Sequence, residues 1–560
     1  MVLENLVTSI GKAKLADFVS NPKGSRQFQQ YIKLGSKEHR NDAIEAICKQ
    51  VPDLAVRNIY ALITLEKIVT YGIKTDETFT VEKMLKPVMT DRKTVEQLLF
   101  HRLGCKFLNK LYMHPSIKPA LKKQMLQIIL VPRSIELLGE STPKLRQYYL
   151  ETAKKCIDKE LLGYELVQRL LKQAVVDFAG DATFNEELLA MASDGLPHLL
   201  SSREGVHVAV KLLGIASAKQ KKNIIKELKG KFAEMAKNSV TCVALLRLLQ
   251  CVDDTVLVGK SVLTELVGSD YAVGKDLLLD PTGRTAFLFV LESLQMKSMR
   301  LYYQPDKQLL DATPITSSLK ERDVKAAELI AKLAPSVSKI VKSEMTEVLH
   351  NDTAKDVVVA LMRTVDDAER SEIVNAMSHA LIEGEMSQSV VSAVNSVLKE
   401  FSAIAARPVW AALVELLSRS DDAVVTLMTG LGSFIIMNLL KAEDQTVVES
   451  VRGFLLKWAE DIKSIAAGVK GTEIVKTELA AMKTGTNWDE TKESFKLSAK
   501  RVRETIAEKP VEVKKQKTAQ PKQTNAEGEN QEELFGDDEE LDDEMWGIVG
   551  DDDEFFDDAE

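Results

Sequence analysis

Hydrophobic residues recur at spacings of three and four along most of the chain, from Met1 to about Lys483. This is the period of an amphipathic helix, and the periodic segments run for about 12–18 residues between breaks at Gly, Pro, Ser or Asp. Examples are 41–50, 94–112, 205–214 and 240–251. We find no run with the period-two alternation of a half-buried strand. The sequence therefore predicts an all-α protein.

Small residues open these apolar helices at regular intervals. The openings are Gly24, Ala61, Gly104, Gly205, Thr241, Gly283, Ala354, Gly432 and Gly471. Successive openings are 37, 43, 36, 42 and 39 residues apart, and longer intervals of 101, 71 and 78 residues leave room for two or more weaker units each. A period near 40 in a helical chain indicates a solenoid of stacked repeats, each burying its apolar face against its neighbours. Armadillo and HEAT repeats have similar periods, so spacing alone does not select the repeat family.

One uncharged stretch, Ala423–Leu440, has to be considered as a membrane span because it runs for 18 residues. It contains Gly430 and Gly432, which would interrupt a single helix. Two short buried helices meeting at a turn fit this stretch better. We therefore expect no membrane span.

Composition agrees with a large helical core, since 45% of residues are hydrophobic and 28% are charged. The five cysteines show no close pairing, which indicates a reducing compartment and no disulfide framework. Residues 527–560 hold 18 of the 83 acidic residues and no Lys or Arg. The preceding 526 residues therefore carry 74 basic and 65 acidic groups, a net charge of +9 against −9 for the whole chain. The protein is a mildly basic body with an acidic tail.

The helix that opens at Gly24 carries Ser25, Arg26 and Gln29 on one side. A hydroxyl, a planar cation and an amide suit an exposed nucleotide base, because the amide can meet a base edge and the guanidinium can stack on the ring. An ordinary helix start with a polar face is the alternative. The triplet is a candidate base-edge site.

Four separated segments resemble, in the same order, stretches of the Puf-A/Penguin group of pumilio-related proteins. They are REGVHVAV (203–210), QCVDDTVLVGKSVLTEL (250–266), TSSLKERDVKAAELI (316–330) and KGTEIV (470–475). The resemblance implies about eleven pumilio-type (armadillo-like) repeats in a right-handed, angled two-block solenoid, with nucleic acid on a basic inner face. It also implies a nuclear, mainly nucleolar protein in large-subunit ribosome assembly, with translational repression as a further role. We place the blocks at 1–319 and 320–485, joined by a loop at about 297–319.

In base-reading pumilio repeats each inner helix presents three side chains to one base. The corresponding positions of the other repeats hold residues such as Leu62, Val206, Cys242 and Leu246, which cannot discriminate a base edge. We therefore expect RNA binding of low sequence specificity, through phosphates, with DNA as a possible second ligand. The phosphate-contact candidates are Arg26, Lys33, Arg57, Lys67, Lys106, Lys110, His207, Lys211, Arg247 and Arg284. A further basic cluster, 219–231, is expected to be solvated on an outer helix or turn.

We find no sequence pattern for a catalytic, cofactor or metal site. The seven histidines are scattered without a zinc-ligand spacing, and there is no phosphate-loop or nucleophile-elbow motif. Asp253, Asp254 and Thr255 resemble an acid pair, but an N-cap before an apolar helix explains them better. We expect a monomeric non-enzyme.

The last 75 residues differ in composition. Residues 486–526 form a flexible basic linker that could serve as a nuclear import signal, and 527–560 form a disordered acidic tail. The tail carries spaced apolar residues (Leu534, Phe535, Trp546, Phe555 and Phe556). It could bind a basic or ribosome-assembly partner, cover the basic face of the solenoid, or act only as a solubilising end. The long basic N-terminal extension usual in Puf-A proteins is absent from this sequence. The functional alternative for the whole chain is a protein-interaction scaffold that does not bind nucleic acid.

Overall fold

The computed structural model describes residues 7–484, apart from 8–9, 12–13, 76, 90, 116, 131–141, 296–303, 385, 420–421, 431 and 466–469. The predicted linker and tail lie outside the described residues. Within the described part the regular structure is helical and contains no strand, which confirms the all-α prediction.

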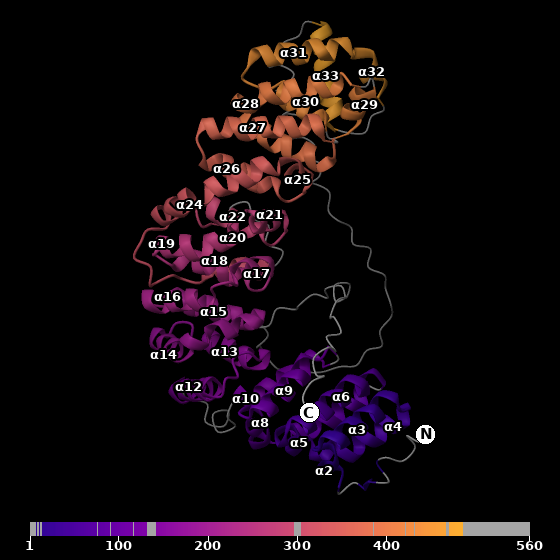
Figure 1. The fold of residues 1–560 in the computed structure, drawn as a ribbon, viewed down its shortest axis with the longest axis vertical. Helices are drawn as coiled ribbons and strands as arrows, with labels where there is room; N and C mark the ends of the chain where they lie inside the picture. The colour runs from indigo at the N-terminus through magenta and orange to yellow at the C-terminus, as the bar shows by residue number, and fades with distance from the viewer. Residues whose placement is uncertain are drawn as a thin grey trace, which may run out of the picture. The chain divides into compact units, whose positions relative to one another are not determined.

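Eleven helices form a continuous ladder in which each contacts the next. We call this set the inner ladder, and Figure 1 shows several of its members stacked in chain order. They are α3 (Pro22–Leu34), α6 (Ile59–Thr75), α9 (Arg102–Met113), α13 (Glu165–Asp177), α15 (Arg203–Ile215), α18 (Cys242–Cys251), α22 (Arg284–Leu291), α26 (Lys355–Thr364), α28 (Gln388–Leu417), α30 (Ser433–Leu439) and α33 (Lys470–Thr484).

Other helices pack against the ladder or against one another beside it. They are α2 (Leu15–Val19), α4 (Lys37–Ile47), α5 (Val51–Arg57), α7 (Glu77–Val88), α8 (Arg92–Leu99), α10 (Pro119–Leu130), α12 (Thr142–Asp158), α14 (Ala182–Ala192), α16 (Ala218–Glu227), α17 (Phe232–Lys237), α19 (Thr255–Val258), α20 (Thr264–Val267), α21 (Ala272–Leu279), α23 (Gln304–Ala312), α24 (Arg322–Ser343), α25 (Met345–His350), α27 (Asp367–Glu383), α29 (Asp422–Thr429), α31 (Gln445–Lys457) and α32 (Ala459–Ser464). Short 3₁₀ turns (Cys48–Gln50 and Ser193–Ser201) and a π turn (Gly259–Leu263) complete the set.

The recurring small residue at the ladder openings has a steric cause. At Gly24 a Cβ atom would lie 2.0 Å from the carbonyl oxygen of Phe18, and at Gly205 it would lie 1.9 Å from that of Leu199. In both repeats the preceding helical turn packs directly against the first turn of the ladder helix, so no side chain fits there. This close approach sets the period detected in the sequence.

The longer intervals between openings divide differently. The 101-residue interval contains α13 and the 78-residue interval contains α28, so each holds one further ladder helix and not the two or more weaker units expected. The 71-residue interval holds none, because α22 contacts α26 directly. It is filled by α23, α24 and α25 instead. The predicted loop at 297–319 is partly wrong, since Gln304–Ala312 within it form α23.

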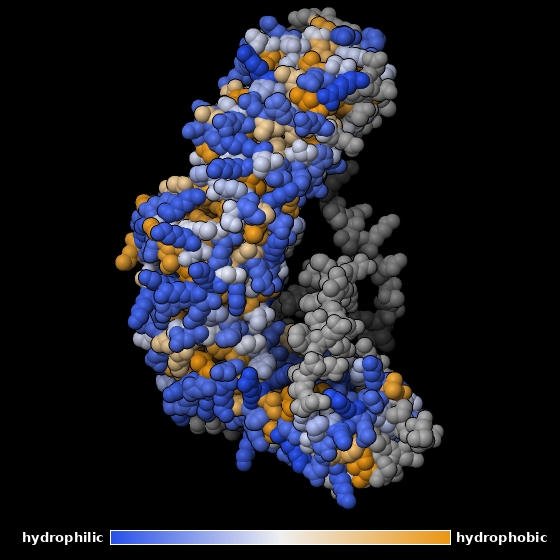
Figure 2. All heavy atoms as spheres, viewed as in Figure 1, coloured by the Kyte–Doolittle hydropathy of each residue, from blue (hydrophilic) through white to orange (hydrophobic). Residues whose placement is uncertain are grey.

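The core is continuous along the stack. Phe28, Phe107, Phe184, Phe232 and Phe287 are completely buried at successive levels, and truncating such a side chain to Ala costs about 3–5 kcal/mol. All five cysteines are buried and unpaired. The face drawn in Figure 2 is mostly hydrophilic, with hydrophobic residues in small separated groups.

The uncharged stretch 423–440 forms the two short helices α29 and α30, as predicted. Among the described residues, no helix combines the length and hydropathy that crossing a membrane requires. The described residues also hold no group of three His, Cys, Asp or Glu side chains placed to bind a metal ion.

Candidate nucleic-acid interface

The predicted base-edge triplet lies on α3, but only one of its members is available. Ser25 is 1% exposed, and its hydroxyl donates to the carbonyl of Tyr60 (3.0 Å) and lies 2.9 Å from the Thr64 hydroxyl on α6. The Gln29 amide in turn donates to Ser25 Oγ at 2.8 Å. The base-edge prediction for Ser25 is therefore wrong, because this hydroxyl joins two ladder helices. Arg26 is exposed and has no ion pair within the described part of the chain.

Four of the predicted phosphate contacts follow Arg26 along the first ladder helices. Lys33 and Lys67 are exposed without an ion pair to any described residue, and Lys110 is half-buried. Lys106 is exposed, with its ammonium 3.6 Å from a carboxylate oxygen of Glu66. These residues remain candidates for phosphate contact. Arg57, by contrast, lies on α5 outside the ladder and pairs with Asp17 at 2.5 Å.

The cations on α13 were missed by the sequence analysis. Arg169 Nη1 lies 2.9 Å from Glu204 Oε1, and Lys172 Nζ lies 3.0 Å from Glu204 Oε2. Both cations are about a third exposed or less. The repeat pattern does not mark this helix because its opening residues, Glu165, Leu166 and Val167, include no small residue. Its signal was the spacing of Arg169 and Lys172, which puts two cations on one face.

Together with two residues of α15, these side chains form a group that we call the basic cluster: Arg169, Lys172, His207 and Lys211. Burial, together with the charges of Lys172, Lys211 and Arg169 in that order, lowers the pKa of His207 to about 3. Burial also lowers the pKa of Lys211, with Lys172 contributing. Three cations thus lie near one neutral imidazole, with the Glu204 carboxylate between two of them and the Glu165 carboxylate also near Arg169. The arrangement favours an added anion.

The neutral state of His207 corrects its predicted role as a cation. Its Nε2 is buried without a hydrogen-bond partner among the described residues. A neutral imidazole can still donate one hydrogen bond to a phosphate oxygen. The cluster's charge therefore comes from Arg169, Lys172 and Lys211.

The predicted phosphate contacts beyond α15 are wrong. Arg247 is 1% exposed, and its guanidinium donates to the carbonyl oxygens of Val210, Thr313 and Pro314. Arg284 is 8% exposed and lies 3.2 Å from a carboxylate oxygen of Asp356. Neither charge is available to a ligand, because neighbouring elements already use it.

The 219–231 cluster is mostly solvated, as expected, but Lys221 is not. It is 3% exposed, and its ammonium donates to the carbonyl of Cys251 at 2.8 Å and to Ser317 Oγ at 2.7 Å. Asp254 accepts from the Leu257 amide at 2.9 Å, which confirms its predicted role as an N-cap.

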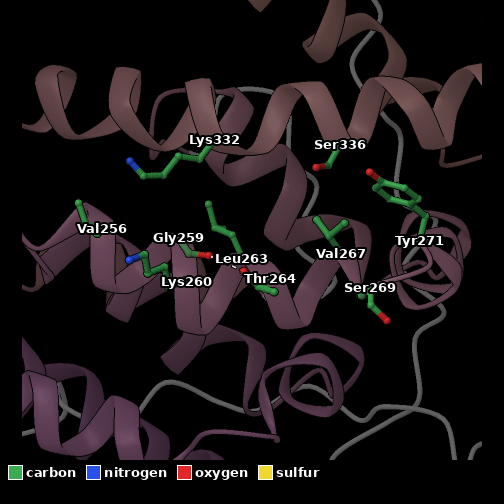
Figure 3. A pocket seen from close by; sticks show the side chains of 11 residues that line it. Val256, Gly259, Lys260, Leu263, Thr264, Val267, Ser269, Tyr271, Lys332 and Ser336 are labelled. Carbon is green, nitrogen blue, oxygen red and sulfur yellow. Dashed lines mark hydrogen bonds between the residues drawn. The ribbon is translucent and has the colours of Figure 1, made fainter.

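A surface hollow lies outside the ladder, between the turn Gly259–Leu263 and helix α24. It measures about 400 Å³ and has an apolar floor that includes Leu263 and Val267. Figure 3 shows Lys260 and Lys332 at one end and Tyr271 at the other. None of its lining residues belongs to the inner ladder, so this hollow is separate from the candidate interface.

The chain is similar to several known proteins. Residues 279–414 match the model of the CPL (NUC119) domain. Pumilio homology domain family member 6 of Schizosaccharomyces pombe is 27% identical over 242 residues, which cover 42% of this chain and 36% of that protein. Its namesake from Saccharomyces cerevisiae is 24% identical over 367 residues, 62% of this chain and 53% of the relative. The matches thus span about half of these relatives' length or less.

Solved structures of human Puf-A show the same fold. The structure of the protein alone has a TM-score of 0.70 at 18% identity and covers 85% of this chain and 94% of that chain. A structure of human Puf-A in complex with DNA gives a TM-score of 0.68 at 17% identity, with the same coverage. The predicted pumilio-type solenoid is confirmed.

Proposed function

Since the chain belongs to the Puf-A/Penguin family of pumilio-related proteins, we propose that it binds RNA with low sequence specificity through the basic side of its first five ladder helices. The observation that carries this proposal is the basic cluster on α13 and α15, where three cations surround a neutral histidine. Cations on consecutive ladder helices offer a row of positive charges along which a nucleic-acid backbone can lie.

Low sequence specificity follows from the burial of the edge-reading positions. Ser25, Cys105, Val206 and Cys242 are all at most 3% exposed, so their side chains cannot reach a base edge. Phosphate contacts carry no sequence information, and they make binding strongly salt-dependent. The DNA complex of human Puf-A supports a recognition mode based on features that RNA and DNA share.

The test is fluorescence anisotropy with the full chain and two single-stranded 12-nucleotide RNAs of identical composition and scrambled order, from 50 to 300 mM salt. We expect dissociation constants that agree within about threefold at each salt concentration, and affinity that falls steeply with salt. A preference of a hundredfold for one order would contradict low specificity. Absence of binding at 50 mM salt would favour the protein-interaction scaffold.

We further propose that the protein acts in nucleolar large-subunit ribosome biogenesis or in translational regulation of mRNA, with the acidic tail binding a basic assembly partner. The family resemblance supports the ribosomal and translational roles. The excess of carboxylates with spaced aromatic residues in 527–560 supports the binding of a basic partner by the tail. Fractionation of cell extracts tests both. We expect the chain in nuclear pre-ribosomal fractions and a weaker association when 527–560 are deleted. Exclusive recovery with cytoplasmic mRNA would contradict the ribosomal role.

A further inference from the structure

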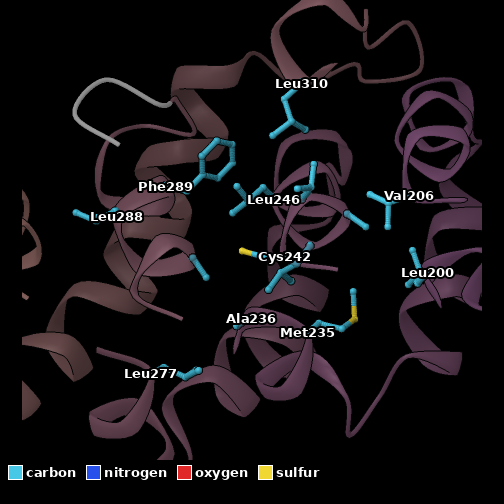
Figure 4. Packing of buried hydrophobic residues seen from close by; sticks show 14 of the residues in the cluster. Leu200, Val206, Met235, Ala236, Cys242, Leu246, Leu277, Leu288, Phe289 and Leu310 are labelled. Atoms are coloured by element: carbon cyan, nitrogen blue, oxygen red, sulfur yellow. The ribbon is translucent and has the colours of Figure 1, made fainter. Parts of the chain in front are cut away.

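A segment distant in sequence lies across the middle of the inner ladder. Residues 305–319, which we call the strap, comprise most of α23 and the extended residues that follow it. Helix α23 contacts both α15 and α18, and Asp306 pairs with Arg203 at the start of α15. Figure 4 shows Leu310 of the strap above Leu246, with Phe289 and Val206 on either side. The strap therefore covers the positions at which a base-reading pumilio repeat would meet its base.

This cover explains why those positions are apolar. At these positions Leu246 and Val206 are at most 2% exposed, and the neighbouring Phe289 and Leu310 are 0% and 3% exposed. A hydrophobic residue at a base-edge position would be poorly solvated on an open groove. Here it packs against the chain's own helix, and the burial stabilises the fold.

The extended part of the strap is held by the buried guanidinium of Arg247. This group donates to the carbonyls of Thr313 (2.6 Å) and Pro314 (3.0 Å). On α15, the carbonyl of Gly214 accepts from the Thr316 amide at 3.1 Å and from Ser317 Oγ at 2.9 Å. The backbones approach so closely that a Cβ on Gly214 would lie 2.5 Å from the Pro314 oxygen.

Two buried lysines extend this attachment. Lys221 donates to Ser317 Oγ, and Lys325 donates to Ser318 Oγ at 2.9 Å and to Asp253 at 3.1 Å. Asp253 also accepts from Ser318 Oγ at 2.6 Å and from the Leu319 amide at 2.7 Å. Burying a cation is costly unless its donors are satisfied. The strap supplies acceptors to three buried cations, so it is a fixed part of the folded chain.

Beyond the strap, three cations of the ladder have partners on the chain, whereas Lys399 on α28 is exposed without an ion pair to any described residue. Arg284 pairs with Asp356, Lys355 donates to Ser392 Oγ at 2.5 Å, and Arg363 pairs with Glu400. Before the strap, Arg26, Lys33 and Lys67 have no ion pair within the described residues. Among the described residues, exposed cations without an ion pair are therefore more frequent on the ladder before the strap than beyond it.

We propose that the strap ends the nucleic-acid track at α15, so that a bound strand contacts α3, α6, α9, α13 and α15 and does not continue along the remaining six ladder helices. This inference rests on the proposed RNA binding and defines its extent. At one nucleotide per pumilio-type repeat, the track holds about five nucleotides. The ligand is thus a short single-stranded stretch, which can be part of a longer RNA.

The first test measures affinity for single-stranded RNAs of 3 to 12 nucleotides, corrected for the number of binding registers, at several salt concentrations. The slope of log affinity against log salt should steepen by roughly 0.7 per nucleotide and level off at about −3.5 to −4 near five or six nucleotides. A slope that keeps steepening to about −8 at eleven nucleotides would overturn the proposal. Absence of salt-dependent binding at every length would overturn RNA binding itself and the track limit with it.

A pair of matched substitutions tests the same limit without altering the strap's anchors. Lys67 on α6 is exposed, and Lys307 is half-buried on α23. Lys67→Gln should weaken binding about fourfold at 0.15 M salt, the effect of one lost phosphate contact, whereas Lys307→Gln should change it less than twofold. Weakening by Lys307→Gln equal to that by Lys67→Gln would show that the strand runs over the strap and would refute the proposal.

Discussion

Replacing Arg169, Lys172 and Lys211 together by Gln should remove most of the affinity that the basic cluster contributes. Each lost contact with a single-stranded phosphate reduces the salt slope by about 0.7, which at 0.15 M salt corresponds to about 0.8 kcal/mol or fourfold in affinity. Three contacts amount to about 2.4 kcal/mol, so affinity should fall about 50-fold and the slope should become shallower by about 2.

The assay is anisotropy of a labelled 12-nucleotide RNA at five salt concentrations, with circular dichroism to confirm that the variant is folded. The matched control is Glu204→Gln. Glu204 lies 2.9 and 3.0 Å from Arg169 and Lys172 and competes with a phosphate for them, so its neutralisation should tighten binding severalfold. A folded triple variant that keeps the wild-type slope would refute the placement of the phosphate contacts. Weaker binding by Glu204→Gln would refute the competition.

Other outcomes follow from single residues. The pKa of His207 in the folded state, about 3, is below the ordinary value of 6.5, so the unfolded chain binds this proton more tightly. Stability should therefore fall by up to about 1.4 kcal/mol per pH unit as the pH drops below 6.5. His207→Gln should flatten the pH dependence of the urea-denaturation midpoint between pH 6.5 and 4.5, and an unchanged pH profile would contradict the burial of His207. Ser25→Ala should cost about 1–3 kcal/mol of unfolding free energy in the same assay and leave RNA sequence preference unchanged, because the hydroxyl is buried between helices; a changed base preference would restore its base-reading role. Arg247→Met should cost at least about 2 kcal/mol and speed proteolysis within the strap, since three carbonyls lose their donor; unaltered cleavage would show that other contacts hold the strap. Deleting 527–560 should leave RNA affinity within twofold if the tail binds a separate partner, whereas tighter binding would show that it covers the basic face.

The repeat frame was predictable because it depends on local sterics. A small residue, most often glycine, is favoured where one helical turn packs against the next, as at Gly24 and Gly205, and the resulting period near 40 can be read directly along the chain. The pattern of small opening residues did not reveal helices α13 and α28, although their hydrophobic periodicity is ordinary. Secondary structure and repeat type were therefore determined by the sequence more fully than the repeat count was.

Whether each inner-face cation is exposed or buried was decided only by the tertiary structure. Lys67 and Arg247 both lie six residues after the opening of their repeats, yet Lys67 is exposed and Arg247 is 1% exposed. The difference comes from Thr313 and Pro314, which lie more than 60 residues beyond Arg247 in the chain and accept its hydrogen bonds. Position within a repeat places a cation on the ladder, but a segment from elsewhere in the chain can accept its hydrogen bonds and bury it, so that it is no longer available to a ligand. The sequence by itself determined the helical frame, and the packing of the strap decided which part of that frame can meet a ligand, because solvent exposure depends on contacts between residues far apart in the chain.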